Sequence, residues 1–258
     1  MLFFVFTFIV ALISFAAPIV LLRICAKKWH TSPKIFWRAG MAGILIAILV
    51  FWVTLNIDGA FPSFDNLPDL VQALILGFMT GLFSELGKFI ILDRMMPAVR
   101  NRESGLLFGM GWSGVGIILT GFFLIFGVFG MQNLLNTKDF STVAPNADQN
   151  QIQFLQQSQQ QLQQLVSGSP FKAVTPLFES VALFILDMAM TLLIIFGLNI
   201  KQTRYVWLAV GIRTVLSTLM LYFTQTGTVP VEFVFVGWMI VGAAVIYYVQ
   251  KMIKRSPV

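Results

Sequence analysis

Residues 173–198 have the sequence AVTPLFESVALFILDMAMTLLIIFGL, and Glu179 and Asp187 are its only charged side chains. A helix needs ~20 predominantly apolar residues to cross ~30 Å of hydrocarbon at ~1.5 Å per residue, and this run is long enough. It lacks the alternation of apolar and polar residues that is typical of a membrane β-barrel strand. Because the backbone must satisfy its own hydrogen bonds inside a bilayer, the run predicts a transmembrane helix.

Six further runs of the same kind occur along the chain. They lie near residues 2–22, 36–57, 69–97, 104–131, 205–223 and 229–249. The 104–131 run is longer than a span requires, so we expect it to tilt or to project from the bilayer. Hydrophobic residues make up 57% of the chain and charged residues only 11%, against about 25% charged residues in a soluble domain. We therefore predict an all-α integral membrane protein of about seven transmembrane helices, folded as a single domain over residues 1–258.

The basic residues predict the orientation of these spans. Most of the 17 lysines and arginines lie in the first, third and fifth connections and in the tail, whereas the other connections hold only Lys138 and Lys172. Under the positive-inside rule this asymmetry predicts an N-terminus outside and a C-terminus in the cytoplasm, in the plasma membrane of a bacterium. The net charge of +6 thus follows from topology and favours anionic lipid head groups, and we expect no binding to nucleic acid.

One connection, at residues 132–172, is large and is predicted to lie outside. It contains a glutamine-rich stretch in which Ile152, Leu155, Leu162 and Leu165 recur at roughly helical spacing. An uncharged amphipathic helix would fit this pattern, lying on the outer membrane surface, over the mouth of the bundle or against a partner. A solvated low-complexity linker fits it equally well.

Four ionisable side chains remain near the middle of the predicted spans: Glu85, Lys88, Asp187 and Arg213. A lone charge at the centre of a membrane helix costs ~2.5–3.5 kcal/mol, so these side chains are expected to face the interior of the bundle. Glu85 and Lys88, three residues apart, share one helix face, and Asp187 with Arg213 forms a second pair of opposite charges. Either a functional site or a structural polar lock would account for them.

Small residues crowd the third and fourth spans around these charges. They are Gly77, Gly81, Ser84, Gly87, Gly105, Gly109, Gly111, Gly114, Gly116 and Gly121. Small residues at such spacings allow membrane helices to pack backbone to backbone. The run Gly109-x-Gly111-x-x-Gly114 formally matches a dinucleotide-binding fingerprint, but it lies inside a span and follows no strand, so we assign it to packing.

Two motifs carry a resemblance to a known family. The segments GLFSELGKF at 81–89 and LFGMGWSG at 107–114 are similar to those of the YhfC-type intramembrane peptidases, which are grouped with the CAAX-prenyl-protease-like membrane proteases and the Aph subunit of γ-secretase. The resemblance implies a CAAX-protease-like helical bundle and a hydrolase. In the family, a glutamate and an arginine lie on span three, a histidine and a glutamate on span four, and one histidine on each of spans five and six. The resemblance implies that the glutamate and histidines activate water for peptide-bond hydrolysis.

The present chain matches this pattern only in part. Glu85 and Lys88 fall at the acidic and basic positions of span three, whereas Trp112 stands at the expected histidine of span four. Asp187 and Arg213 stand at the histidine positions of spans five and six. These five residues are the candidate catalytic site. A catalytic metal normally needs three protein ligands and an open position, which these residues do not supply, so we expect no metal and no other cofactor.

Three functional hypotheses follow. The first is a peptidase-like protein without peptidase activity that has a binding or regulatory role and recognises a membrane peptide or protein partner. The second is an active, divergent intramembrane protease that uses Glu85 as general base and Asp187 as its partner. The third is a transporter with an intramembrane ion-pair network, for which the chain lacks the matching broken spans and inverted repeat that transporters commonly show.

Overall fold

A computed structural model describes residues 2–57, 64–137, 149–167 and 170–255. Within these ranges the chain forms helices and no strand. Seven of the described helices are long and apolar enough to cross a membrane, as the sequence predicts. The protein is therefore a multi-pass helical membrane protein, and the orientation of its termini stays a prediction.

The chain divides into two compact units. The first unit comprises Met1–Ala17 and Ile118–Leu177, and the second unit comprises Pro18–Ile117 and Phe178–Val258. Part of the predicted outer loop, at 138–148 and 168–169, lies outside the described residues, as does 58–63 in the connection after the second span. The assignment of residues 132–172 to an outer loop of a single domain stays a prediction.

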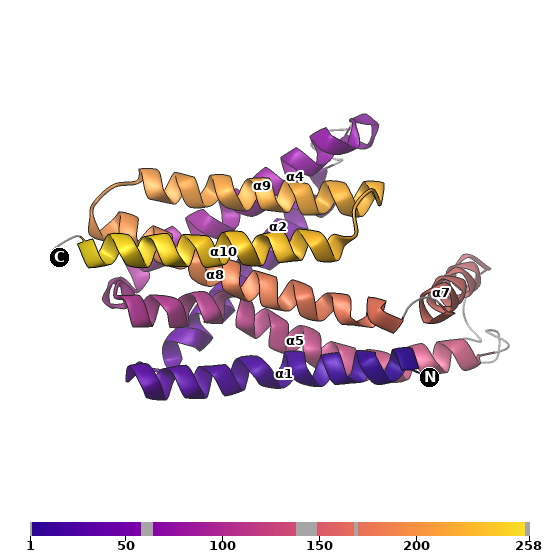
Figure 1. Ribbon diagram of the computed structural model, residues 1–258. Coiled ribbons are helices and arrows are strands. Elements are labelled where there is room, and N and C mark those ends of the chain that lie inside the picture. The colour runs from indigo at the N-terminus through magenta and orange to yellow at the C-terminus, as the bar shows by residue number, and fades with distance from the viewer. Residues whose placement is uncertain (1, 58–63, 138–148, 168–169, 256–258) are drawn as a thin grey trace. The chain divides into compact units, whose positions relative to one another are not determined.

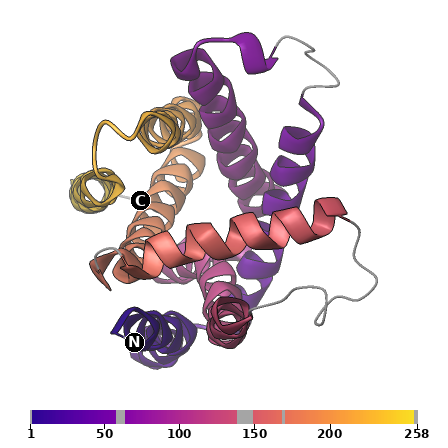
Figure 2. The same cartoon turned by 90° about the vertical axis from the view of Figure 1, so that its right-hand side faces the viewer.

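The first unit contains the glutamine-rich segment. Its elements are the first part of α1 (Leu2–Trp29), the last part of α5 (Arg102–Asn136), α7 (Gln149–Ser167), η4 (Pro170–Val174) and the first residues of α8 (Thr175–Asn199). The amide nitrogen of Gln159 on α7 donates hydrogen bonds to the carbonyl oxygens of Leu134, at 2.8 Å, and of Thr137, at 2.9 Å. These carbonyls lie at the C-terminal end of α5, where the helix itself leaves them without a partner. Figure 2 shows α7 running across the view while this end of α5 is seen end-on.

The second unit contains the remaining helices. Besides the end of α1 and the start of α5, they are α2 (Lys34–Leu55), α4 (Asp69–Ile90), nearly all of α8 (Thr175–Asn199), α9 (Arg204–Thr226) and α10 (Val231–Arg255). α4 packs along α9 and also contacts α2, and α10 packs against α9 (Figure 1). In the most apolar stretch of α8, 67% of the residues are buried, a larger share than in the other candidate spans. Helix α8 therefore forms the centre of the unit's core.

Short helical turns join the spans. They are η1 (Phe64–Asn66) before α4, and η2 (Ile91–Met95) and η3 (Pro97–Val99) between α4 and α5. Helix α1 continues to Trp29, beyond the end of the apolar run predicted at residue 22. The extra residues include Arg23, Lys27 and Lys28, and helix α1 can extend over them because lysine and arginine are good helix formers.

Candidate functional site

Helices α4 and α9 approach each other closely at the level of the buried charges. Glu85 and Lys88 lie on one face of α4 because they are three residues apart. A Cβ atom at Gly81 would lie 2.9 Å from the backbone nitrogen of Thr214 on α9, so the approach requires glycine. This contact brings Arg213, the residue before Thr214, to the level of the α4 pair.

A second glycine allows α5 to approach α8 beside Asp187. A Cβ atom at Gly109 would lie 2.8 Å from the carbonyl oxygen of Asp187 and 2.6 Å from the Cα atom of Met188. The contact is therefore made between backbones, in the manner typical of small residues in membrane helices. Gly109, the first glycine of the dinucleotide-like run, serves helix packing.

Lys88 joins the two buried carboxylates. Its Nζ atom donates a hydrogen bond of 2.8 Å to Oε1 of Glu85 and another of 2.7 Å to Oδ1 of Asp187. Glu85 and Lys88 are 0% exposed and Asp187 is 2% exposed, so solvent does not screen these ion pairs. The ammonium thus occupies the space between the two carboxylates and links α4 to α8.

Arg213 completes a cluster with no net charge. Its Nη1 atom donates to the same Oδ1 of Asp187, at a longer 3.4 Å. Within the described part of the chain, Nε of Arg213 and Oε2 of Glu85 are buried without a hydrogen-bond partner. The cluster therefore keeps some unused donors and acceptors in its interior.

Two tryptophan rings contact the cations of this cluster. The Lys88 ammonium lies 5.5 Å from the centroid of the Trp112 ring, and the Arg213 guanidinium lies 5.6 Å from the centroid of Trp238. Both distances are within the range of cation–π attraction, ~6 Å. Trp112 also stacks on Phe108, with 5.8 Å between ring centroids, and the Trp238 indole nitrogen donates to the carbonyl oxygen of Leu216 at 3.2 Å. Both rings are thus held in place.

The structure brings together all five residues predicted from the sequence: Glu85, Lys88, Trp112, Asp187 and Arg213. The predicted pairs, Glu85 with Lys88 and Asp187 with Arg213, are both present. The contact between Lys88 and Asp187 was not predicted, and neither was the role of Trp238. No sequence signal marks Trp238, because one tryptophan in an apolar span is ordinary. The catalytic role of the five residues stays a prediction.

Residues 62–240 match the family described as YhfC intramembrane metalloprotease. The chain belongs to the YhfC family. The match covers more than half of the chain, including every residue of the ion-pair cluster. No curated protein and no solved structure matches the chain.

The family description implies a metal, and the donor set of this YhfC protein does not fit one. The space between Glu85 and Asp187 holds the Lys88 ammonium, and Arg213 adds a second positive charge that would repel a cation. Trp112 offers no ligand atom. Over the ranges that the structure describes, no three His, Cys, Asp or Glu side chains lie close enough to hold a metal ion. No reaction step can be derived through a metal here.

Proposed function

We propose that this YhfC protein has lost the peptidase chemistry of its family and acts as a binding or regulatory membrane protein. The observation that carries the proposal is the Lys88 ammonium, which lies 2.8 Å from Glu85 and 2.7 Å from Asp187. A general base must be free to accept a proton from water, and a catalytic metal needs several ligands with an open position. Lys88 occupies one oxygen of each carboxylate and places a positive charge between them, where a metal ion or a reacting water would have to bind.

The replacements at the family's histidine positions support the same proposal. Trp112, Asp187 and Arg213 cannot supply imidazole, and they contact or extend the ion-pair cluster instead. In this proposal the cluster holds α4, α8 and α9 together without reacting. The protein then recognises a membrane-embedded peptide or a protein partner and leaves its peptide bonds intact.

A proteolysis assay on the purified, lipid-embedded protein tests this proposal. The wild-type protein and the Glu85→Gln variant are incubated with a set of transmembrane peptides, and products are identified by mass spectrometry. We expect no cleavage by either protein. Glu179→Gln is the matched control, because Glu179 lies on α8 about two turns from Asp187. Cleavage by the wild type and by Glu179→Gln that is lost in Glu85→Gln would overturn the proposal.

One observation favours a second candidate function, that of an active but divergent hydrolase. Oε2 of Glu85 is buried and accepts no hydrogen bond from the described residues. This oxygen could accept a proton from a water molecule while Oε1 stays bound to Lys88. Glu85 would then act as general base with Asp187 as its partner. The assay above separates the two candidates, because only the hydrolase requires cleavage that depends on Glu85.

A further inference from the structure

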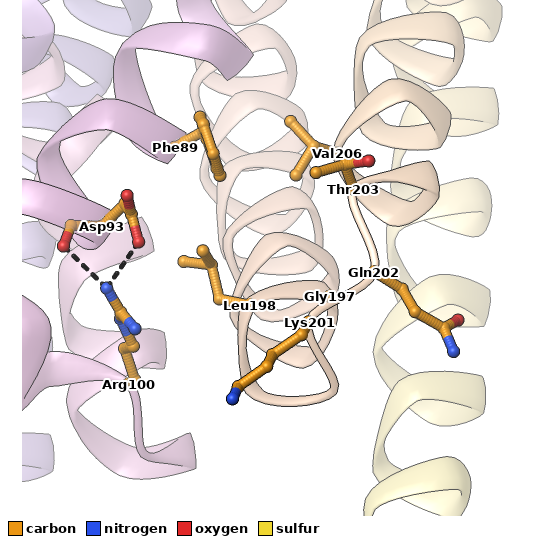
Figure 3. Close-up of a pocket in the computed structure, with 9 residues that line it drawn as sticks. All are labelled: Phe89, Asp93, Arg100, Gly197, Leu198, Lys201, Gln202, Thr203 and Val206. Atoms are coloured by element: carbon orange, nitrogen blue, oxygen red, sulfur yellow. Dashed lines mark hydrogen bonds and ion pairs between the residues drawn. The ribbon is translucent and has the colours of Figure 1, made fainter.

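A second polar site lies in the second unit, apart from the ion-pair cluster. It is a cavity of about 380 Å³ beside the turn between α8 and α9 (Figure 3). Its lining comes from the end of α4, from η2, from the residue after η3, from the end of α8, from the turn that follows and from the start of α9. The lining residues are Phe89, Asp93, Arg100, Gly197, Leu198, Lys201, Gln202, Thr203 and Val206. None of the four charged cluster residues is among them.

The charges of the lining leave one cation unbalanced. Nη2 of Arg100 donates to Oδ1 of Asp93 at 2.7 Å, and the same guanidinium donates to the carbonyl oxygens of Leu92, at 3.1 Å, and of Asp93, at 2.7 Å. Arg100 is therefore fixed, and it neutralises the only acid of the lining. Lys201 forms no hydrogen bond or ion pair with the described residues through its side chain, which extends toward the Arg100 side of the cavity in Figure 3. The cavity carries a net positive charge.

Lys201 occupies a backbone position at which glycine is usual. The Gln202 amide donates to the Gly197 carbonyl at 2.8 Å, and the Lys201 amide donates to the Leu198 carbonyl at 3.2 Å. This is the pattern of a Schellman motif, in which the residue after the helix end takes left-handed φ and is most often glycine. Lys201 has φ 55°, a conformation that is costly for a side chain with a Cβ atom. A lysine at this position supplies a charge that glycine cannot.

We propose that this cavity binds the phosphate group of an anionic phospholipid. The lining comes from the end of the third span, the connection to the fourth, the end of the fifth span and the start of the sixth. These ends lie on one side of the bilayer, at the depth of the lipid head groups. Phe89, Leu198 and Val206 give the cavity an apolar wall, which suits the glycerol and upper acyl region of a lipid better than free phosphate.

The surface of the lining elements also suits acyl chains. Met95 at the end of η2 is 73% exposed, and Trp207 in the first turn of α9 is 57% exposed. Exposed apolar and tryptophan side chains near the ends of spans typically contact lipid at the membrane interface. A lipid bound by its phosphate at Lys201 would thus find exposed apolar side chains on η2 and α9, two of the elements that line the cavity. This proposal does not depend on whether the ion-pair cluster is catalytic.

Native mass spectrometry of the full-length protein tests the proposal. Protein purified in detergent is exposed to an equimolar mixture of phosphatidylglycerol and phosphatidylcholine, and the ratio of the two retained lipids is measured. We expect the wild type to prefer phosphatidylglycerol, and Lys201→Asn to lower this preference about fivefold, the effect of one basic residue on anionic lipid binding. Asparagine suits the left-handed backbone, so this variant should fold normally.

A charge-matched pair provides the control. Lys201→Glu should abolish the preference, whereas Lys251→Glu, which makes the same change at an exposed position of α10 outside the cavity, should leave it near the wild-type value. Equal losses in the two variants would show that diffuse positive charge attracts the lipid, and the proposal would be wrong. Displacement of phosphatidylglycerol by inorganic phosphate would likewise overturn the assignment to a lipid.

Discussion

Removing the charge of Lys88 tests the ion-pair cluster most sharply. Lys88→Met keeps an unbranched apolar stem up to the ε position and deletes the ammonium that lies 2.8 Å from Glu85 and 2.7 Å from Asp187. Two buried carboxylates then share one cation, Arg213, whose Nη1 atom is 3.4 Å from Asp187. Breaking a buried ion pair by removing one partner costs about 3–5 kcal/mol. We expect Lys88→Met to lower the free energy of unfolding by this amount.

A double-mutant cycle then separates pairing from other effects. Asp187→Asn should also cost about 3–5 kcal/mol, because it leaves an excess of positive charge in the core. The double variant with Lys88→Met leaves one acid and one base, Glu85 and Arg213. Its loss in free energy of unfolding should therefore be smaller than the sum of the two single-variant losses by about 2 kcal/mol. A coupling of this size is typical of residues in one ion-pair network. The double variant Glu85→Gln with Asp187→Asn removes both acids and leaves the two cations, Lys88 and Arg213. Its loss in free energy of unfolding should therefore be larger than the sum of the two single-variant losses.

Unfolding by SDS in mixed micelles, followed by circular dichroism of the helices, gives these free energies. Lys251→Met is the matched control, because Lys251 is exposed on α10, and it should change stability by no more than about 0.5 kcal/mol. A loss for Lys88→Met no larger than that of Lys251→Met would show that the Lys88 ammonium does not stabilise the fold. Losses that add to within about 0.5 kcal/mol in the double variant would equally show that Lys88 and Asp187 are not paired.

Two further predictions concern topology and packing. Tags at the C-terminus and within 24–35 should be labelled only from the cytoplasm and tags within 140–165 only from outside; labelling of 140–165 from the cytoplasm would reverse the predicted orientation. Gly109→Val should lower the free energy of unfolding by about 1–3 kcal/mol, because the larger side chain overpacks against α8. Gly116→Val on the same helix should be tolerated, because nothing lies within 4 Å of the Cβ position at Gly116. Equal effects of the two changes would contradict the close approach of α5 to α8.

The number of spans could be predicted from the sequence because each span is a continuous apolar run. The ends of the spans were less certain, as at α1, where the apolar run stops before Arg23 but the helix continues to Trp29. Hydropathy measures the fit to hydrocarbon, whereas helix formation depends on backbone hydrogen bonds that charged residues also make. A helix can therefore extend past its membrane-embedded part without a signal in hydropathy.

The membership of the charged cluster could also be predicted, because buried charges in a membrane must face one another. Two of its pairs, Glu85 with Lys88 and Asp187 with Arg213, could be predicted as well, but the contact between Lys88 and Asp187 could not. Glu85 and Lys88 are paired by their spacing on one helix, whereas the contact between Lys88 and Asp187 depends on the register of α4 against α8. Backbone contacts, such as the one at Gly109, set that register, and no pattern within a single helix encodes it. The cavity at Lys201 was missed for the same reason, since its lining comes from several span ends.

The Lys88 ammonium lies between Glu85 and Asp187, the two buried carboxylates that a metal ion in this cluster would need as ligands. The zinc content of the purified protein, measured by inductively coupled plasma mass spectrometry after isolation without chelators, tests most directly whether these carboxylates bind a metal. We predict no stoichiometric zinc in the wild type, because Lys88 and Arg213 exclude a cation from the carboxylates of Glu85 and Asp187. Stoichiometric zinc that disappears on Glu85→Ala or Asp187→Ala would show that these carboxylates bind a metal despite Lys88.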